Sequence, residues 1–165
     1  FNMQNYRFVL VRDPDLRRQI RAAAWDQAQV TDASLLVIMC ADQEAYRKDP
    51  ARYWSHAPKE VQDILVPAMV PFYDDKPRLA RDEAIRSTAL AGMTLMLAAR
   101  GLGYESCPMV GFDPEAVATL IRLPADHVIS FMIAIGKQSK PAWPRGERLS
   151  DREVVITDRF SAQDE

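Results

Sequence analysis

The chain has 165 residues, of which 48% are hydrophobic and 27% charged, and its formal net charge is −2. This length and apolar fraction suit one domain with a buried core. The small net charge gives no reason to expect a nucleic-acid partner, and no basic cluster is dense enough to indicate an anionic membrane surface. The longest apolar run, residues 89–99, is far shorter than the ~20 residues of a membrane span.

The cysteines and histidines do not form a recognisable reactive or metal-binding motif. Cys40 and Cys107 are too far apart for a Cys-x-x-C site, and Cys40 lies in an apolar stretch. We therefore expect two reduced thiols in a cytoplasmic protein without a signal peptide. His56 and His127 have neither metal-ligand spacing nor the partners of a hydrolase triad, so we expect no metal site.

The first part of the chain alternates apolar runs with helix-length connections. Residues 7–11 and 33–41 are apolar runs that are typical of buried strands. Between them, Asp13 and Pro14 predict the cap and first residue of a helix whose arginines form the solvent face. Residues 25–31 are expected to be a polar connection.

The next part is expected to be helical and rich in aromatic residues. Asp42 should cap a helix over residues 43–48, and residues 49–58 should be irregular. Residues 59–73 have a helical pattern that Pro67 is expected to kink or end, because proline cannot donate the helical hydrogen bond.

A central helix is predicted within residues 81–100. Residues 89–99 are apolar on every face, which is typical of a helix enclosed by other elements. Arg100 and Gly101 form the expected helix end. A short crossing over residues 104–107 should then lead into the segment 108–112.

The last part contains one more helix and one more strong strand. Asp113 and Pro114 predict the start of a helix that extends to about Ile121. Residues 127–136 are a third apolar strand, 137–150 a proline-rich basic loop, and 152–157 a final extended piece. Strands mixed with helices predict a layered α+β domain with a central sheet, occupying residues 1–165 as a single unit.

The segment 108–112 is the first candidate for a binding site. Its backbone N–H groups come just before a helix N-terminus, where an electron-rich acceptor is well placed. The alternative interpretation is that this segment is only the start of a helix.

Three segments together resemble the nitroreductase family of FMN enzymes, which are obligate dimers. They are LAARGLGYESCPMVGFD (97–113), NMQNYRF (2–8) and RL…EVV within 148–155. The resemblance implies a mostly antiparallel sheet of four or five strands flanked by helices, with the strand 152–156 donated to the partner subunit. In this family a helix and a basic phosphate-binding segment precede the position of Phe1, so we expect that such a segment is missing from this sequence.

The resemblance implies a flavin site around the segment 108–111. The N–H groups of Val110 and Gly111 would polarise the flavin near N5 and O4, and Pro108 and Met109 would pack along the ring. Asn2 would reach the flavin across the dimer interface. Asn2 alone is almost as well explained as the cap of a turn that enters a strand.

Residues 26–29 correspond to a segment that contacts the flavin in the family, but two of its residue types differ. Asp26 and Gln29 stand where the family has an asparagine and a lysine at the pyrimidine edge. Gln29 can donate to a flavin carbonyl, whereas Asp26 can donate only when protonated, and Gln27 is a possible substitute. A solvated loop is the alternative interpretation of this segment.

The basic tail would supply the phosphate contacts. Arg148 matches the family arginine that holds the FMN phosphate, since a guanidinium fork suits a phosphate monoester. A neighbouring lysine of the family is replaced by Gly146, and Arg145 is a candidate to take its place. Lys137 and Lys140 are interpreted as a solvated charge run.

The implied activity is hydride transfer from NADH or NADPH through FMN to a nitroaromatic, quinone or similar acceptor, with ping-pong turnover. The cofactor carries the chemistry, so no catalytic protein residue is expected. The sequence selects neither the acceptor nor the nicotinamide donor. The alternatives are a flavin-binding protein without turnover and a flavin-free interaction domain. Tyr53, Trp54, Phe72 and Tyr73 either cover an aromatic substrate or simply pack together.

Overall fold

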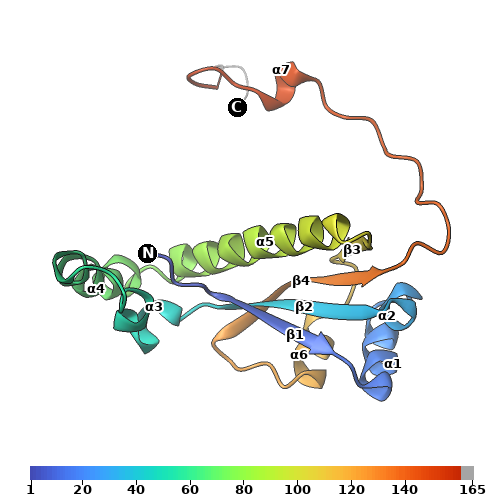
Figure 1. The fold of residues 1–165 in the computed structure, drawn as a ribbon, viewed down its shortest axis with the longest axis horizontal. Coiled ribbons are helices and arrows are strands. Elements are labelled where there is room, and N and C mark those ends of the chain that lie inside the picture. Colours follow the sequence, from blue (N-terminus) through green and yellow to red (C-terminus); the bar gives the residue numbers. More distant parts are fainter. Residues whose placement is uncertain (161–165) are drawn as a thin grey trace.

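The structure is a computed structural model that describes residues 1–160, and its centre is a four-stranded antiparallel sheet (Figure 1). The spatial order of the strands is β1-β2-β4-β3. The strands are β1 (Tyr6–Val11), β2 (Leu35–Asp42), β3 (Glu105–Met109) and β4 (His127–Gly136). This confirms the predicted α+β class and the antiparallel sheet.

Helices cover both faces of this sheet and extend beyond one end of it. The α-helices are α1 (Pro14–Ala23), α2 (Gln29–Asp32), α3 (Ala45–Lys48), α4 (Lys59–Tyr73), α5 (Pro77–Gly101), α6 (Pro114–Leu120) and α7 (Asp151–Val154), and η1 (Pro50–Tyr53) is a 3-10 helix. Helix α5 lies along one face, whereas α1 and α6 cover the other (Figure 1). Within residues 1–160, none of these helices combines the length and apolarity needed to cross a membrane.

The central strands are buried because apolar side chains point to both faces. In β2, Leu36, Ile38 and Cys40 face the α1 and α6 side, and Val37 and Met39 face α5. A strand that is buried on both faces appears in the sequence as a continuous apolar run. This is why β2 and β4 could be predicted from the sequence. Burial raises the pKa of the Cys40 thiol to about 11, so this thiol stays protonated at neutral pH, whereas Cys107 is exposed.

Two helix starts follow directly from their local sequences. The Asp13 carboxylate accepts a hydrogen bond from the N–H of Asp15 at 2.9 Å, and Pro14 is the first residue of α1. The Asp113 carboxylate accepts from the N–H groups of Glu115 and Ala116, at 3.0 Å each, and begins α6. Both predicted caps are confirmed.

Of the two effects expected of Pro67, a kink or a helix end, the second does not occur, since α4 continues from Lys59 to Tyr73 through both Pro67 and Pro71. A proline inside a helix costs about 3 kcal/mol. Here Met69 and Tyr73 on α4 are buried in a cluster with Met3 and Tyr46. The burial of that face holds the helix together despite the missing hydrogen bonds.

The prediction that residues 89–99 are enclosed on all sides is also wrong for this chain. Helix α5 begins earlier, at Pro77, and packs one side on the sheet, where Gly92 lies directly against the Phe131 ring. Its other side exposes Leu90, Met93 and Leu97 by 51–68%. The sequence correctly marked this face as apolar, but no element among residues 1–160 covers it.

Two predictions of extended structure also change. The crossing at 104–107 belongs to edge strand β3, where Pro108 is tolerated because an edge strand need not donate on its outer side. The extended piece predicted at 152–157 instead begins as the short helix α7. Ser150 and Glu153 form a capping box there, with the Ser150 hydroxyl 2.8 Å from the Glu153 carboxylate, which stabilises the helical turn.

Candidate functional site

The loop 108–111 leaves edge strand β3 and is attached to the end of α1. Met109 is the last paired residue of β3, opposite Met132 of β4. Four residues later, the N–H of Asp113 donates to the Ala23 carbonyl at 2.9 Å. The loop is therefore held at both ends, by the sheet on one side and by α1 on the other.

The side chain of Gln27 fixes the loop from the side. Its amide nitrogen donates to the Gly111 carbonyl at 2.6 Å and to the Ala24 carbonyl at 3.1 Å. Gln29 donates in turn to the Gln27 side-chain oxygen at 3.1 Å. Sequence reasoning proposed Gln29 as a ligand and Gln27 only as a substitute. The structure places both beside the loop and makes Gln27 the residue that touches it.

The inner positions of the loop leave backbone donors available. Within residues 1–160, the N–H groups of Val110 and Gly111 donate no hydrogen bond in a turn, loop or cap. Val110 is 78% exposed, and Pro108 is also exposed. The Met109 side chain instead lies in the core with Val117 and Ile20. A ligand at this loop would therefore meet Pro108 and the two amides rather than the Met109 side chain.

Trp25 forms the wall opposite these amides, and sequence reasoning did not identify it. A Cβ atom at Gly111 would lie 2.9 Å from the Trp25 ring and 3.2 Å from the Gln27 amide, so only glycine fits without movement. Trp25 and Asp26 have φ angles of 50° and 56°, in the left-handed region that non-glycine residues seldom occupy. This turn aims the exposed indole at the loop.

Asp26 is directed away from the loop by an ion pair. Its carboxylate accepts from Arg21 Nε at 2.7 Å. Asp26 stands at a position where the family has an asparagine. In the structure, the guanidinium group of Arg21 on α1 forms an ion pair with its carboxylate. Nothing in the spacing of these residues indicates the pairing, because it depends on the left-handed turn.

The remaining predicted site residues lie elsewhere in this chain. Asn2 is exposed, has a φ of 55°, and precedes the buried Met3. It belongs to the end of the sheet where Tyr6 pairs with Ala41, not to the end of α1. Arg145 and Arg148 lie in the irregular exposed tail, which runs away from the sheet toward α7 (Figure 1).

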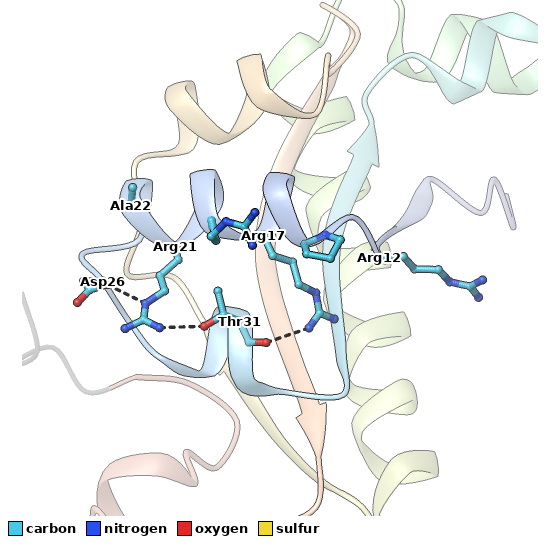
Figure 2. Close-up of a pocket in the computed structure, with 8 residues that line it drawn as sticks. Arg12, Arg17, Arg21, Ala22, Asp26 and Thr31 are labelled. Carbon is cyan, nitrogen blue, oxygen red and sulfur yellow. Dashed lines mark hydrogen bonds and ion pairs between the residues drawn. The ribbon is translucent and has the colours of Figure 1, made fainter.

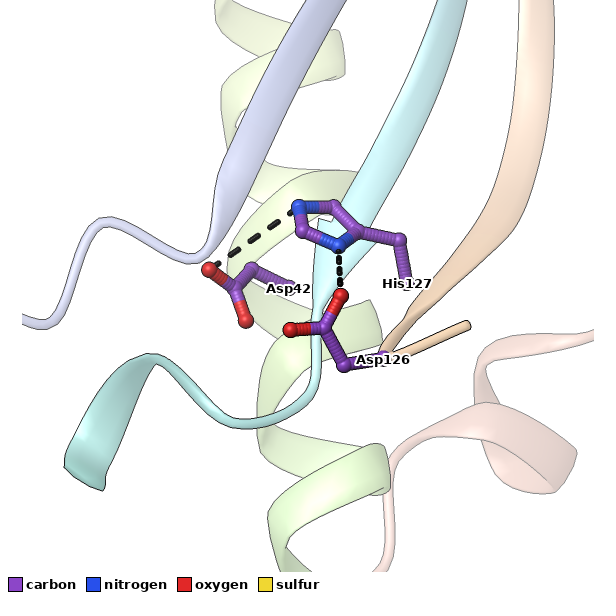
Figure 3. A group of neighbouring side chains, drawn as sticks. All are labelled: Asp42, Asp126 and His127. Carbon is purple, nitrogen blue, oxygen red and sulfur yellow. Dashed lines mark hydrogen bonds and ion pairs between the residues drawn. The ribbon is translucent and has the colours of Figure 1, made fainter. Parts of the chain in front are cut away.

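A separate cluster of charged side chains lies where β2 and β4 meet (Figure 3). One ligand atom each from Asp42, Asp126 and His127 falls within 4.8 Å of the others, an arrangement that could suit a metal ion. The Lys48 ammonium, however, lies 2.8 Å from Asp42 Oδ2 and 2.7 Å from Asp126 Oδ2. Arg7 adds a second cation 3.1 Å from the same Asp42 oxygen. The tethered ammonium occupies the position of a cation, so we interpret the cluster as an ion-pair network.

This network also changes a pKa. Hydrogen bonds from Lys48, and then from His127, lower the pKa of Asp126 to about 2. A carboxylate with a lowered pKa stabilises the fold only while it is ionised. Its contribution to stability is therefore complete above about pH 4 and is lost as the pH falls toward 2.

The role of Gln27 can be tested with a charge-only change. In Gln27→Glu, a carboxylate would face the Gly111 and Ala24 carbonyl oxygens and could donate to neither. Losing a partly buried hydrogen bond and adding this repulsion costs about 1–3 kcal/mol, so we expect the affinity for FMN, the cofactor that the family resemblance implies, to fall by about tenfold or more. Fluorescence titration with FMN measures this change.

Gln19→Glu is the matched control, because Gln19 is exposed on α1 and makes no contact with the loop. It should leave the FMN affinity within about twofold of the original, as isolated surface changes do. Equal affinities for the Gln27→Glu variant and this control would contradict the role of Gln27.

The fold and this loop define an α+β protein of one established family. Residues 1–137 match the model described as Nitroreductase family, and the chain belongs to that family. Among its relatives, Protein DrgA of Synechocystis is 55% identical over 151 residues, which cover 92% of this chain and 71% of DrgA. MhqN of Bacillus subtilis, named provisionally as an NAD(P)H nitroreductase, is 33% identical over 94% of this chain and 79% of its own length.

Solved structures agree with the fold. A provisionally named nitroreductase of Bacillus subtilis, ydfN, has a TM-score of 0.87 and 32% identity, covering 94% of this chain and 78% of its own. A provisionally named nitroreductase of Exiguobacterium sibiricum, solved in complex with FMN, has a TM-score of 0.83 and 26% identity, covering 94% and 78%.

Proposed function

We propose that this protein is an FMN-dependent oxidoreductase that passes hydride from NAD(P)H to a small organic acceptor. Its family and its relatives make it an NAD(P)H-dependent oxidoreductase. The two available amides of Val110 and Gly111, opposite Trp25, are the single observation in this chain that carries the cofactor assignment. The relative solved with FMN supports the same choice of cofactor.

The residues of the loop fit a flavin chemically. Two adjacent N–H donors suit the electron-rich N5 and O4 edge of an isoalloxazine, and the Trp25 ring, which lies against Gly111, bounds the site on one side. The amide oxygen and nitrogen of Gln29 can serve the pyrimidine edge. FMN, when bound, supplies the hydride chemistry, while the chain binds it, orients it and polarises one edge. We propose no catalytic acid or base from the protein.

The apolar side of α5 supports a homodimer as the working form. Leu90, Met93 and Leu97 are exposed at helical spacing, and Phe8 and Leu10 on edge strand β1 are 43% and 46% exposed. Phe8 and Leu10 pair with Met39 and Val37, so they face the same side of the sheet as α5. An apolar surface of this extent marks an interaction site, and we assign it to a second copy of the chain.

The dimer would also bring in the residues that are distant within one chain. Asn2, Arg145 and Arg148 are exposed and lie away from the loop 108–111. We propose that they complete the site of the partner subunit, with the arginines on the FMN phosphate and residues 152–156 added to the partner's sheet. In such a dimer these residues would leave the helical turn of α7 and pair as a strand.

The acceptor is a nitroaromatic, a quinone or a similar electron-poor compound. The relatives carry names for different reactions: one from Thermus thermophilus is named an NADH dehydrogenase, after its donor, and one from Lactiplantibacillus plantarum is named an enone reductase, after its acceptor. An open site without a catalytic side chain is compatible with such variety. Because NAD(P)H is the donor, we propose that the protein acts in the cytoplasm.

One absorption experiment tests the assignment. The purified protein, with FMN added where needed, should show the yellow flavin band, and NADPH or NADH should bleach it in the absence of oxygen. An acceptor should then restore the band. A coloured protein that neither donor bleaches would be a flavin-binding protein without turnover, and a protein that takes up no FMN would be a flavin-free domain. Either result would reject the proposed function.

A further inference from the structure

A cavity of about 610 Å³ lies on the outer side of α1, and it is lined by arginines (Figure 2). Its charged lining residues are Arg12, Arg17, Arg18, Arg21 and Asp26. The sequence suggested that the arginines of this helix only form its solvent face. The structure instead gathers them around one concave surface between α1 and α2.

Arg17 forms a fixed, positively charged floor in this cavity. Its guanidinium donates to the carbonyls of Val11 at 2.9 Å and Ala33 at 2.6 Å. No carboxylate within the described residues lies within ion-pair distance of it. The carbonyls position the guanidinium but carry no net charge, so its positive charge is not neutralised.

The other arginines divide into paired and free groups. Arg21 is held by Asp26 at 2.7 Å, by Asp32 at 4.0 Å and by the Thr31 hydroxyl at 2.9 Å. Arg18 pairs with the exposed carboxylate of Asp15. Arg12 is exposed and, within residues 1–160, makes no ion pair. Together, four guanidinium groups and the three carboxylates of Asp15, Asp26 and Asp32 leave a net charge of +1. Within residues 1–160, Arg12 and Arg17 are the two arginines of this cavity that have no ion-pair partner.

The cavity begins where the candidate flavin loop ends. Asp26 lines the cavity, and the preceding residue, Trp25, lies against Gly111. A ligand with one end at the loop 108–111 can therefore pass over the Trp25–Asp26 turn and place an anionic group among the arginines. A nicotinamide dinucleotide has this shape, since its reacting ring and its adenosine are at opposite ends.

We propose that this arginine cavity binds the 2′-phosphate of NADPH and thereby makes NADPH the preferred hydride donor. The proposal rests on the function proposed above. A phosphate monoester is a dianion at neutral pH, and guanidinium forks bind it through charge-assisted hydrogen bonds. The exposed guanidinium groups of Arg12 and Arg18 donate to the phosphate, and the positive charge of Arg17 lies beside it. NADH lacks this phosphate and gains nothing from the cavity.

The test compares adenosine 2′,5′-bisphosphate with adenosine 5′-monophosphate by calorimetry on the purified protein. The bisphosphate should bind at least about tenfold more tightly, and the Arg12→Gln/Arg18→Gln double variant should reduce this difference to about threefold or less. The ratio of kcat/KM for NADPH to that for NADH should fall by a similar factor. Arg78→Gln/Arg81→Gln on α5 makes the same change of charge away from the cavity and should preserve the preference.

Three results would overturn the proposal. The first is equal binding of the two nucleotides by the unmodified protein. The second is an unchanged nucleotide preference in the folded double variant, as judged by circular dichroism. The third is a matching loss of FMN affinity in that variant, which would assign the cavity to the FMN phosphate. Because nucleotide binding is measured without flavin turnover, failure to bind or reduce FMN rejects the proposed function separately.

Discussion

Replacing Leu90 and Leu97 together by lysine is expected to separate the proposed homodimer and, because the proposed FMN site is shared between its subunits, to remove FMN binding and activity. Both side chains are more than 60% exposed on α5, one above the other at a spacing of two turns. Burying a leucine contributes about 1.5–3 kcal/mol, and each substitution is present in both subunits of a two-fold dimer, so its effect on the interface is doubled. We therefore expect the dissociation constant of the dimer to rise by a factor of at least about a thousand. Analytical ultracentrifugation over a range of protein concentrations measures the change.

The control for this variant is Thr119→Lys. Thr119 is exposed on α6, on the opposite face of the sheet, and the substitution introduces one lysine where the double variant introduces two. This variant should remain dimeric and retain its flavin. If the double lysine variant stays a flavin-containing dimer, α5 is not the dimer interface.

Replacing Asp42 by alanine is expected to produce the largest loss of stability of any single change in the charged network. The Asp42 side chain is 1% exposed, and it accepts from Arg7, Lys48 and the N–H of Glu44. Removing one member of a buried ion pair costs about 3–5 kcal/mol, because the remaining charges lose their partner. Arg7 and Lys48 are 39% and 35% exposed and can regain water, so we expect the lower end, about 3 kcal/mol. Urea unfolding at a fixed protein concentration measures this loss.

Asp63→Ala provides the comparison. Asp63 is 59% exposed on α4, and its only ion-pair partner among residues 1–160 is Lys59, one turn away. Surface ion pairs contribute little, so this variant should lose less than about 0.5 kcal/mol. An Asp42→Ala variant that is as stable as Asp63→Ala would show that the network at the β2–β4 junction does not support the fold.

The differences between prediction and structure have local physical causes. Pro67, expected to kink or end its helix, does not end it, because the burial of Met69 and Tyr73 outweighs the missing hydrogen bond. Strand β3 was missed because proline and glycine surround it, and an edge strand tolerates both. The short helix α7 could have been predicted from its capping box, since Ser150 and Glu153 have the required spacing.

The candidate site was predictable only in part. The loop 108–111 is visible in the sequence because Asp113 and Pro114 mark the helix start that follows it. Its contact with Gln27 joins residues 84 positions apart, and no local pattern specifies it. The same is true of Trp25, whose position against Gly111 depends on two consecutive left-handed residues.

The sequence by itself determined strands β1, β2 and β4, the starts of α1 and α6, and the apolar character of α5, because each depends on side chains within a few residues of one another. Only the tertiary structure decided that Gln27 holds the Gly111 carbonyl, that Lys48 stands between Asp42 and Asp126, and that four arginines share one cavity. These arrangements join distant segments whose approach is set by the packing of the sheet and its helices. Hydrogen bonds and ion pairs of this kind form only after that packing has brought their partners within reach.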